Sequence, residues 1–217
     1  MGIGHFAVGF AAKKFAPKAP LALLLSSALL LDLIWVTFLA IGFERVDISP
    51  DNSVFMPFKF EYYPYSHGLL SAVIWALIFS LVFQWKRAYL TGSLVVFAGV
   101  LSHWVLDSVV HSKDLPIYPG SSAYVGFSLW NHHALSMVVE GILMLVGVLL
   151  YLNVTRPINL AGITGLWAFV LFISALYFGK LAGLPIENHL ALVIYGLAIW
   201  LTIPWAWWIE RHRSVTS

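Results

Sequence analysis

The chain has no cysteine and few charged residues. Of its 217 residues, 10% are Asp, Glu, Lys or Arg, whereas 60% are hydrophobic. The absence of cysteine excludes disulfide bonds, thiolate metal ligands and cysteine nucleophiles. The net charge of +2 is too small for a surface that binds nucleic acid. The mean hydropathy of +0.86 exceeds what a soluble core accommodates, so the composition predicts an integral membrane protein.

Apolar runs separated by short polar turns indicate six membrane-spanning helices. Each run has about 20 residues, which is the length that a helix needs to cross a bilayer. We expect one polytopic membrane domain over residues 1–217, because no stretch resembles a linker or a low-complexity segment. The predicted spans are residues 21–43, 67–85, 89–111, 130–152, 160–179 and 189–208.

The apolar segment of residues 1–16 is too short to cross the bilayer alone. Lys13 and Lys14 follow its apolar run, whereas a signal peptide carries its positive charges before that run. Pro17 and Pro20 then interrupt the helix. The expected fold is therefore an all-α integral membrane protein with six transmembrane helices, preceded by a short N-terminal half-helix.

Basic residues are distributed unequally between the two ends of the predicted helices. The side with more Lys and Arg is expected to be cytoplasmic. This rule places residues 44–65 outside, where we expect a polar loop with its aromatic residues on the lipid headgroups. The richer side carries Lys13, Lys14, Lys18, Lys86, Arg87, Arg156, Arg211 and Arg213, and the other side carries Arg45, Lys59, Lys113 and Lys180.

The third predicted span contains His103, Asp107 and His111 at a spacing of four residues. On an α-helix, this spacing places the side chains along one face. Ionisable groups in a lipid-buried helix are costly unless they are paired, hydrated or bound to a cation. A histidine and an aspartate four residues apart are a common pair of ligands for Zn²⁺. The pattern therefore indicates a functional site, and a metal site is one candidate.

Ionisable residues of other helices are expected at a similar depth. A helical rise of about 1.5 Å per residue places His5 and Asp32 roughly 18 Å from the cytoplasmic edge. The same count gives about 21 Å for His103 and about 27 Å for His67 and Asp107. These five residues therefore occupy one slab in the outer half of a core roughly 30 Å thick.

Several of these residues also have simpler explanations. His5 would be interfacial if the half-helix lay flat on the membrane. His67, at the start of its span, would be a hydrated interfacial residue. Asp32 has no partner in its own helix, so another group must neutralise it. Glu140, about 18 Å deep, is a sixth member of the slab, a carboxyl group bonded to another helix, or an outer partner of a ligating histidine.

Short motifs in the first half of the chain resemble those of one family. They are Gly4-His5-Phe6, Asp32 in the first full span, Ser66-His67, Ser102-His103 with Asp107, and the segment from Leu115 to Pro119. Together they resemble the bacterial membrane-bound metal-dependent hydrolase family over residues 1–120. The family tends to follow its first carboxylate with another Asp and a His, whereas Leu33 and Ile34 follow here. The resemblance implies a hydrolase in the bacterial inner membrane whose metal ligands are His5, Asp32, His67, His103 and Asp107.

The predicted function is a membrane-embedded hydrolase with one or two divalent cations, of which Zn²⁺ is implied by the resemblance. Histidine and carboxylate ligands alone suit Zn²⁺, Fe²⁺ and Mn²⁺ about equally. His111 is a further candidate ligand, and Asp114 or Glu140 is the candidate general base. We expect membrane lipids as partners and an amphiphilic small-molecule ester or phosphoester as substrate. The alternatives are a proton or metal-ion transporter, a haem or di-iron redox protein, and a non-catalytic membrane protein.

Overall fold

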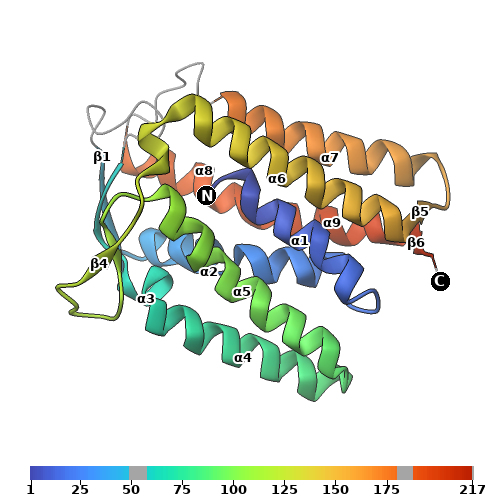
Figure 1. Ribbon diagram of the computed structural model, residues 1–217, viewed down its shortest axis with the longest axis horizontal. Coiled ribbons are helices and arrows are strands. Elements are labelled where there is room, and N and C mark those ends of the chain that lie inside the picture. The colour runs from blue at the N-terminus through green and yellow to red at the C-terminus, as the bar shows by residue number, and fades with distance from the viewer. Residues whose placement is uncertain (49–57, 180–187, 217) are drawn as a thin grey trace.

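The structure, a computed structural model, describes residues 1–48, 58–179 and 188–216. Its helices run side by side along the long axis, and short strands lie at the two ends (Figure 1). Six helical segments among the described residues are long and apolar enough to cross a membrane, which confirms the predicted all-α membrane fold. The spans are α2 (Leu21–Ala40), α4 (Leu69–Arg87), α5 (Leu90–Val110), α6 (His133–Val154), α7 (Leu160–Gly179) and a last span over His189–Arg211.

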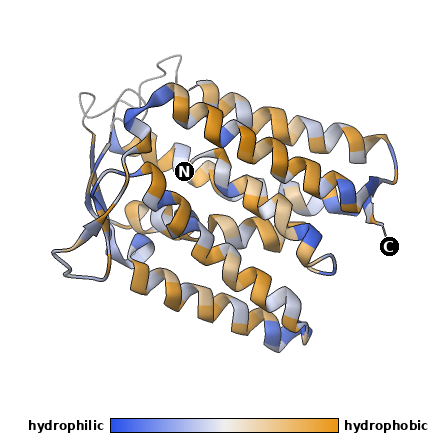
Figure 2. Ribbon diagram, in the orientation of Figure 1, coloured by the Kyte–Doolittle hydropathy of each residue, from blue (hydrophilic) through white to orange (hydrophobic). Residues whose placement is uncertain are grey.

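The outer surface of the helices is apolar. Figure 2 shows hydrophobic residues along the helices and hydrophilic residues mainly at their ends. Large side chains such as Leu81, Leu94 and Leu171 are more than 60% exposed on this surface. An apolar surface of this extent is costly in water, but in a bilayer it contacts lipid tails. The chain is therefore built as a multi-pass membrane protein.

The N-terminal half-helix lies inside the bundle. Helix α1 (Ile3–Phe15) has 13 residues and a length of about 20 Å, which is too short to cross a bilayer. It packs most extensively against α6, and also against α2 and α5 (Figure 1). His5, Phe6 and Phe10 are buried in these contacts. The structure therefore excludes the alternative in which this helix lies flat on the membrane surface.

A buried ion pair joins the first helical hairpin to the last helix. The ammonium group of Lys13 pairs with Oε1 of Glu210 in α9 (Thr202–Arg211) and donates to the carbonyl oxygen of Ala19 at 2.7 Å. The other carboxylate oxygen of Glu210 accepts the backbone N–H of Leu21 at 2.7 Å and so caps the start of α2. The hairpin of α1 and α2 is thereby fixed to α9.

Lys13→Met should destabilise the fold, because it leaves the carboxylate of Glu210 without a counter-ion. Breaking a fully buried pair costs about 3–5 kcal/mol, and we expect about 2 kcal/mol because the Glu210 side chain is 26% exposed. The midpoint of thermal unfolding in detergent measures this loss. Lys14→Met is the matched control, since Lys14 is the next residue in the sequence and its side chain is exposed. Equal midpoints for the two variants would show that the ion pair does not stabilise the fold.

The close approach of α1 to α6 depends on a glycine. A Cβ atom at Gly147 would lie 2.4 Å from the carbonyl oxygen of Ala7 and 2.7 Å from its Cα. These are backbone atoms, which cannot rotate away, so a larger residue would push the two helices apart. Gly141 lies on the same helix and faces open space. The position of α1 is therefore set by its contact with α6 at Gly147.

The segment expected to be a polar loop contains a β-hairpin. Strand β1 (Arg45–Ile48) pairs antiparallel with β2 (Phe58–Tyr62). Val46 is buried, and Phe60 packs against the cluster of buried side chains that includes Tyr63. Part of the expected polar loop is therefore regular structure, because apolar side chains of the hairpin pack on buried partners; its placement at the headgroups stays a prediction. Pro50, Asp51 and Pro57, which belonged to that expectation, lie outside the described residues.

Two of the predicted spans are interrupted. A separate short helix, α3 (Pro64–His67), precedes the second span, because Gly68 has an extended backbone. The last span consists of α8 (His189–Leu197), a 3-10 turn and α9. Pro204 lacks an N–H and crowds the carbonyl of Trp200, which favours that tighter turn. The remaining strands are β3 (Leu115–Pro116) with β4 (Tyr124–Val125) and β5 (Thr155–Pro157) with β6 (Arg213–Val215).

Candidate metal centre

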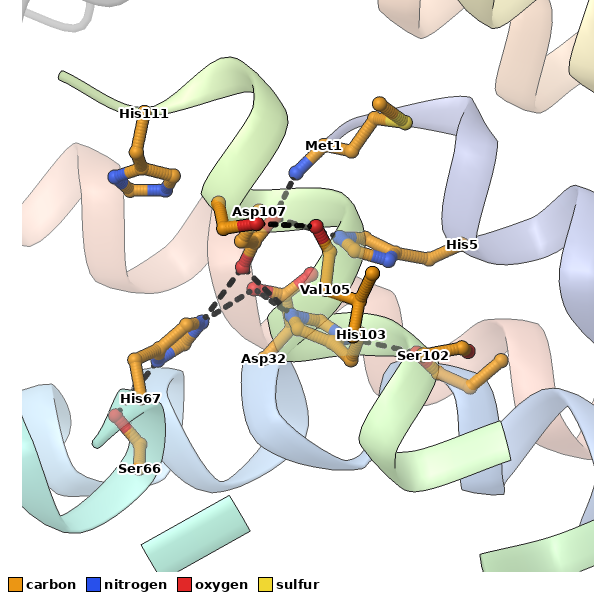
Figure 3. Close-up of polar contacts among 12 residues, drawn as sticks. Met1, His5, Asp32, Ser66, His67, Ser102, His103, Val105, Asp107 and His111 are labelled. Atoms are coloured by element: carbon orange, nitrogen blue, oxygen red, sulfur yellow. Dashed lines mark hydrogen bonds and ion pairs between the residues drawn. The ribbon is translucent and has the colours of Figure 1, made fainter. Parts of the chain in front are cut away.

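Three histidines and two aspartates from four helices meet inside the bundle (Figure 3). They are His5 on α1, Asp32 on α2, His67 on α3, and His103 and Asp107 on α5. Oδ2 of Asp107 lies 3.2 Å from Nε2 of His103 and 3.5 Å from Nε2 of His67, and Oδ1 lies 3.1 Å from Nε2 of His5. Oδ1 of Asp32 lies 3.6 Å from Nε2 of His67 and 3.7 Å from that of His103. The structure thus brings together the five residues for which the sequence predicts a common depth.

The cluster is closed on most sides. His5, His67, His103 and Asp107 are each at most 4% exposed. The side chain of Asp32, by contrast, is 24% exposed. Buried histidines and carboxylates are stable only when they neutralise one another or bind a cation. The exposed side of Asp32 is therefore where a cation, water or a substrate reaches this cluster.

Nδ1 of His103 is bonded to the backbone of α2. It lies 2.8 Å from the carbonyl oxygen of Ala28, which can only accept, so Nδ1 carries a proton. Nε2 points at the carboxylate oxygens of Asp107 and Asp32, which are 3.2 Å and 3.7 Å away. With a proton, Nε2 pairs with these carboxylates; without one, Nε2 and the carboxylate oxygens are ligands for a single cation. Four ligands at about 2.0–2.1 Å from Zn²⁺ are themselves about 3.3 Å apart.

His67 is held through a chain of hydrogen bonds that the sequence did not reveal. Its Nδ1 lies 2.8 Å from Oγ of Ser66, and that hydroxyl donates to Oε2 of Glu44 at 2.6 Å. Oε1 of Glu44 accepts the backbone N–H groups of Tyr65 and Ser66, each at 2.9 Å. Burial raises the pKa of Glu44, and these donors oppose the rise. With Ser66 donating to Glu44, Nδ1 of His67 donates to Ser66, and Nε2 of His67 points at the aspartates.

His5 completes the cluster by stacking on His103. The two ring centroids are 3.6 Å apart, and the ring planes differ by 3°. Nδ1 of His5 is buried without a hydrogen-bond partner among the described residues. The amino group of Met1 also forms an ion pair with Asp107, through the same oxygen that faces His5. Asp107 is therefore the carboxylate around which the histidines are arranged.

Two groups of three side chains could each hold a cation. His5, His103 and Asp107 form the first group, and Asp32, His67 and His103 form the second, with the ligand atoms of each group within 4.8 Å of one another. His103 belongs to both groups. Histidine nitrogens and carboxylate oxygens fit Zn²⁺, Fe²⁺ and Mn²⁺, so the donor set fits a transition metal. The partners of Nδ1 on His67 and His103 are those expected for metal-ligating histidines.

The structure does not bring His111 into either group. Helix α5 ends at Val110, and His111 follows it with an extended backbone, so the spacing of four no longer keeps it on the same helix face. Nδ1 of His111 pairs with Oδ1 of Asp114 at 3.0 Å, and its ring packs 4.6 Å from the ring of Trp130. Figure 3 shows His111 apart from the cluster. The predicted ligand His111 and the predicted base Asp114 therefore form a pair of their own.

Glu140 lies beside α1. It is fully buried, and its Oε2 accepts the backbone N–H of Gly4 at 3.2 Å. The first N–H groups of a helix have no partner within the helix, and a carboxylate at this end is favourable. Of the alternatives for this residue, the bond across to another helix is the one that the structure shows. Glu140 thus holds the start of the helix that carries His5.

Comparisons with known sequences and structures found no relative of this chain. The short motifs are therefore what supports the resemblance to membrane-bound metal-dependent hydrolases, which stays a prediction. No family model matches the sequence, and no curated protein and no solved structure matches it either.

Proposed function

We propose that this protein is a membrane-embedded hydrolase that depends on one or two divalent cations, with Zn²⁺ as the metal. The ligands would be His5, Asp32, His67, His103 and Asp107. The observation that supports this proposal most is the convergence of Nε2 of His103 on the oxygens of two carboxylates, with Nδ1 held by the Ala28 carbonyl oxygen. Bound Zn²⁺ lowers the pKa of a water molecule towards neutrality and polarises an ester or phosphoester oxygen. Cysteine is not needed for this chemistry.

The protein side chains have separate tasks in this proposal. Asp107 supplies negative charge to three histidines, and Glu44 with Ser66 fixes the orientation of His67. Asp114 pairs with His111 apart from the five-residue cluster, so no described contact supports it as the general base that the sequence predicted. Glu140 is fully buried and its carboxylate accepts the backbone N–H of Gly4, so its role is to position α1. The exposed side of Asp32 admits the substrate.

The test of this function needs no knowledge of the substrate. Protein purified in a non-ionic detergent without chelators should contain one or two divalent cations per chain, which elemental analysis measures. The loaded protein should cleave a water-insoluble ester or phosphoester from a substrate panel, and removal of the metal should stop the reaction. A folded preparation without any divalent cation would rule out the proposed hydrolase.

Ser66→Ala should weaken metal binding, because it breaks the hydrogen-bond chain that orients His67. Loss of such an outer partner typically costs about 10- to 100-fold in metal affinity. Competition with a chromophoric chelator measures the affinity. Ser66→Thr keeps the hydroxyl group and should restore most of the affinity. Ser71→Ala removes a nearby hydroxyl whose one bond among the described residues is to the Pro64 carbonyl oxygen. A loss with Ser71→Ala equal to that with Ser66→Ala would contradict the role of Ser66.

The proposed location is the bacterial inner membrane, with the ends of the helices near Lys13, Lys86 and Arg211 in the cytoplasm. Most of the basic residues behind this orientation are described, whereas Lys180 lies outside the described residues. A single cysteine at Asp47, in the cysteine-free chain, should react with an impermeant maleimide on intact cells. A cysteine at Arg87 should react only after permeabilisation. The reverse pattern would place the β1–β2 hairpin in the cytoplasm.

A further inference from the structure

A pocket distinct from the five-residue cluster lies at the end of the bundle that carries α3. Its volume is about 440 Å³, within the roughly 300–1,000 Å³ typical of small-molecule sites. The lining residues belong to β2, to the adjoining turn at Tyr63 and Pro64, and to the segment from Lys113 to Tyr124. Figure 1 shows this end opposite the end that carries the C-terminus. By the proposed orientation it faces outward, at the level of the lipid headgroups.

Aromatic rings form much of the wall. Tyr118 and Tyr124 line the pocket and are each 50% exposed, so their rings are accessible. Phe60 and Tyr62 line it from β2. The guanidinium group of Arg45, the cross-strand neighbour of Tyr62, lies 5.9 Å from the Tyr62 ring. Aromatic walls of this kind are a common way to bind ammonium groups, including quaternary ones.

Charges of both signs stand beside these rings. Lys113 and Glu61 line the pocket, are exposed and form no ion pair with another described residue. Asp114 adds a second carboxylate, which pairs through Oδ1 with His111. A simple anion would leave the carboxylates unpaired, and a simple cation would leave Lys113 unpaired. A ligand with an ammonium group and a phosphate satisfies both kinds of charge.

We propose that this pocket binds the zwitterionic headgroup of a phospholipid, with the ammonium group among the tyrosine rings and carboxylates and the phosphate beside Lys113. Binding itself rests on the pocket alone. That the bound lipid is the substrate of the metal centre rests on the proposed function.

Tyr63 connects the pocket to the cluster. It lines the pocket, is 2% exposed, and its ring lies 5.5 Å from that of His67 and 6.2 Å from that of His111. A headgroup in the pocket would therefore lie one side chain away from His67.

Soluble headgroup analogues test the proposal on the full chain. Isothermal titration calorimetry in a detergent without ammonium or phosphate groups should show that O-phosphocholine binds at least about five-fold more tightly than glycerol 3-phosphate, which lacks the ammonium group. Choline, which lacks the phosphate, should also bind more weakly than O-phosphocholine. Equal binding of glycerol 3-phosphate and O-phosphocholine would identify a plain anion site, and no binding of any analogue would refute the pocket; either result overturns the proposal.

Substitutions locate the binding and separate it from catalysis. Tyr124→Ala and Lys113→Ala should each weaken O-phosphocholine binding by about three-fold or more. Trp85→Ala is the control, because Trp85 is 84% exposed near the end of α4, outside the pocket. His103→Ala should lose the metal but still bind O-phosphocholine, so the pocket proposal and the metal-centre proposal are tested separately. Unchanged affinity in both pocket variants would overturn the proposal.

The source of the headgroup is decided in lipid nanodiscs. If lipids of the surrounding bilayer reach the pocket, discs of phosphatidylcholine should suppress the binding of free O-phosphocholine, whereas discs of phosphatidylglycerol should not. Equal binding in both discs would show that the pocket takes a free solute, which overturns the assignment to a membrane lipid.

Discussion

Asp107→Ala should abolish metal retention and hydrolysis together. The carboxylate of Asp107 lies within 3.5 Å of a ring nitrogen of each of the three clustered histidines, so no other side chain among them replaces it. Loss of an outer partner costs about 10- to 100-fold in metal affinity, and loss of this shared carboxylate should cost more. Elemental analysis and the hydrolysis assay, on the same preparation, measure both effects. Asp47→Ala removes an exposed carboxylate of β1 and is the control.

Two further substitutions at Asp107 separate a hydrolase from a proton-coupled carrier. In the hydrolase, Asp107→Glu displaces the carboxylate by about one methylene group and should retain some metal with much weaker activity. Asp107→Asn removes the negative charge and should lose the metal. In a carrier, Asp107 would exchange a proton in each cycle, so Asp107→Asn should uncouple transport from pH and leave substrate binding largely intact. Metal content unchanged by Asp107→Asn would therefore support the carrier.

Gly147→Val should also remove the metal, although residue 147 is not a member of the cluster. The added side chain would collide with the backbone of Ala7, and α1 would have to move away from α6. His5 lies two residues before Ala7 and its ring stacks 3.6 Å from His103, so even a small shift of α1 separates them. We expect metal affinity to fall by at least about 100-fold, as for a misplacement of about 1 Å at a site that needs defined geometry. The chelator competition described for Ser66 measures this fall.

Gly141→Val is the matched control on the same helix. A Cβ atom there meets no other atom within 4 Å, so the same substitution has room for its side chain. Thermal unfolding of the two variants distinguishes a displaced α1 from a lost fold. If Gly147→Val binds metal as tightly as Gly141→Val, the contact at Ala7 does not control the position of His5.

The sequence was sufficient to predict which residues meet wherever they lie on regular helices, because the position of a residue along a helix gives its depth in the membrane. His5 and Asp32 meet because the two arms of the α1–α2 hairpin have similar lengths from the prolines to these residues, and hydrophobic spans keep the helices upright. His103 and Asp107 meet because both lie within one regular helix. The same reasoning failed at His111, since the helix ends one residue earlier and its face no longer continues.

Glu44 shows what sequence patterns do not contain. It precedes β1 in a segment with other acidic residues, and nothing local distinguishes it from an exposed loop residue. Its burial at 1% exposure depends on the turn at α3, whose N–H groups it accepts, and on the fold of the hairpin after it. Ser66 carried a weak signal, because a hydroxyl residue beside a ligating histidine is a natural hydrogen-bond partner. Contacts between loops and helix ends require the tertiary structure.

The ion pair of Lys13 with Glu210 has a consequence for the order of events during synthesis. Asp32, His67, His103 and Asp107 all enter the membrane before α6, against which α1 packs, and well before α9, to which Lys13 is tied. Helix α1 therefore reaches its full set of contacts only after α6 has been inserted, and its Lys13 is paired only when α9 follows. Metal uptake by chains arrested at increasing lengths would report this order, with tight binding delayed until α6 is in the membrane.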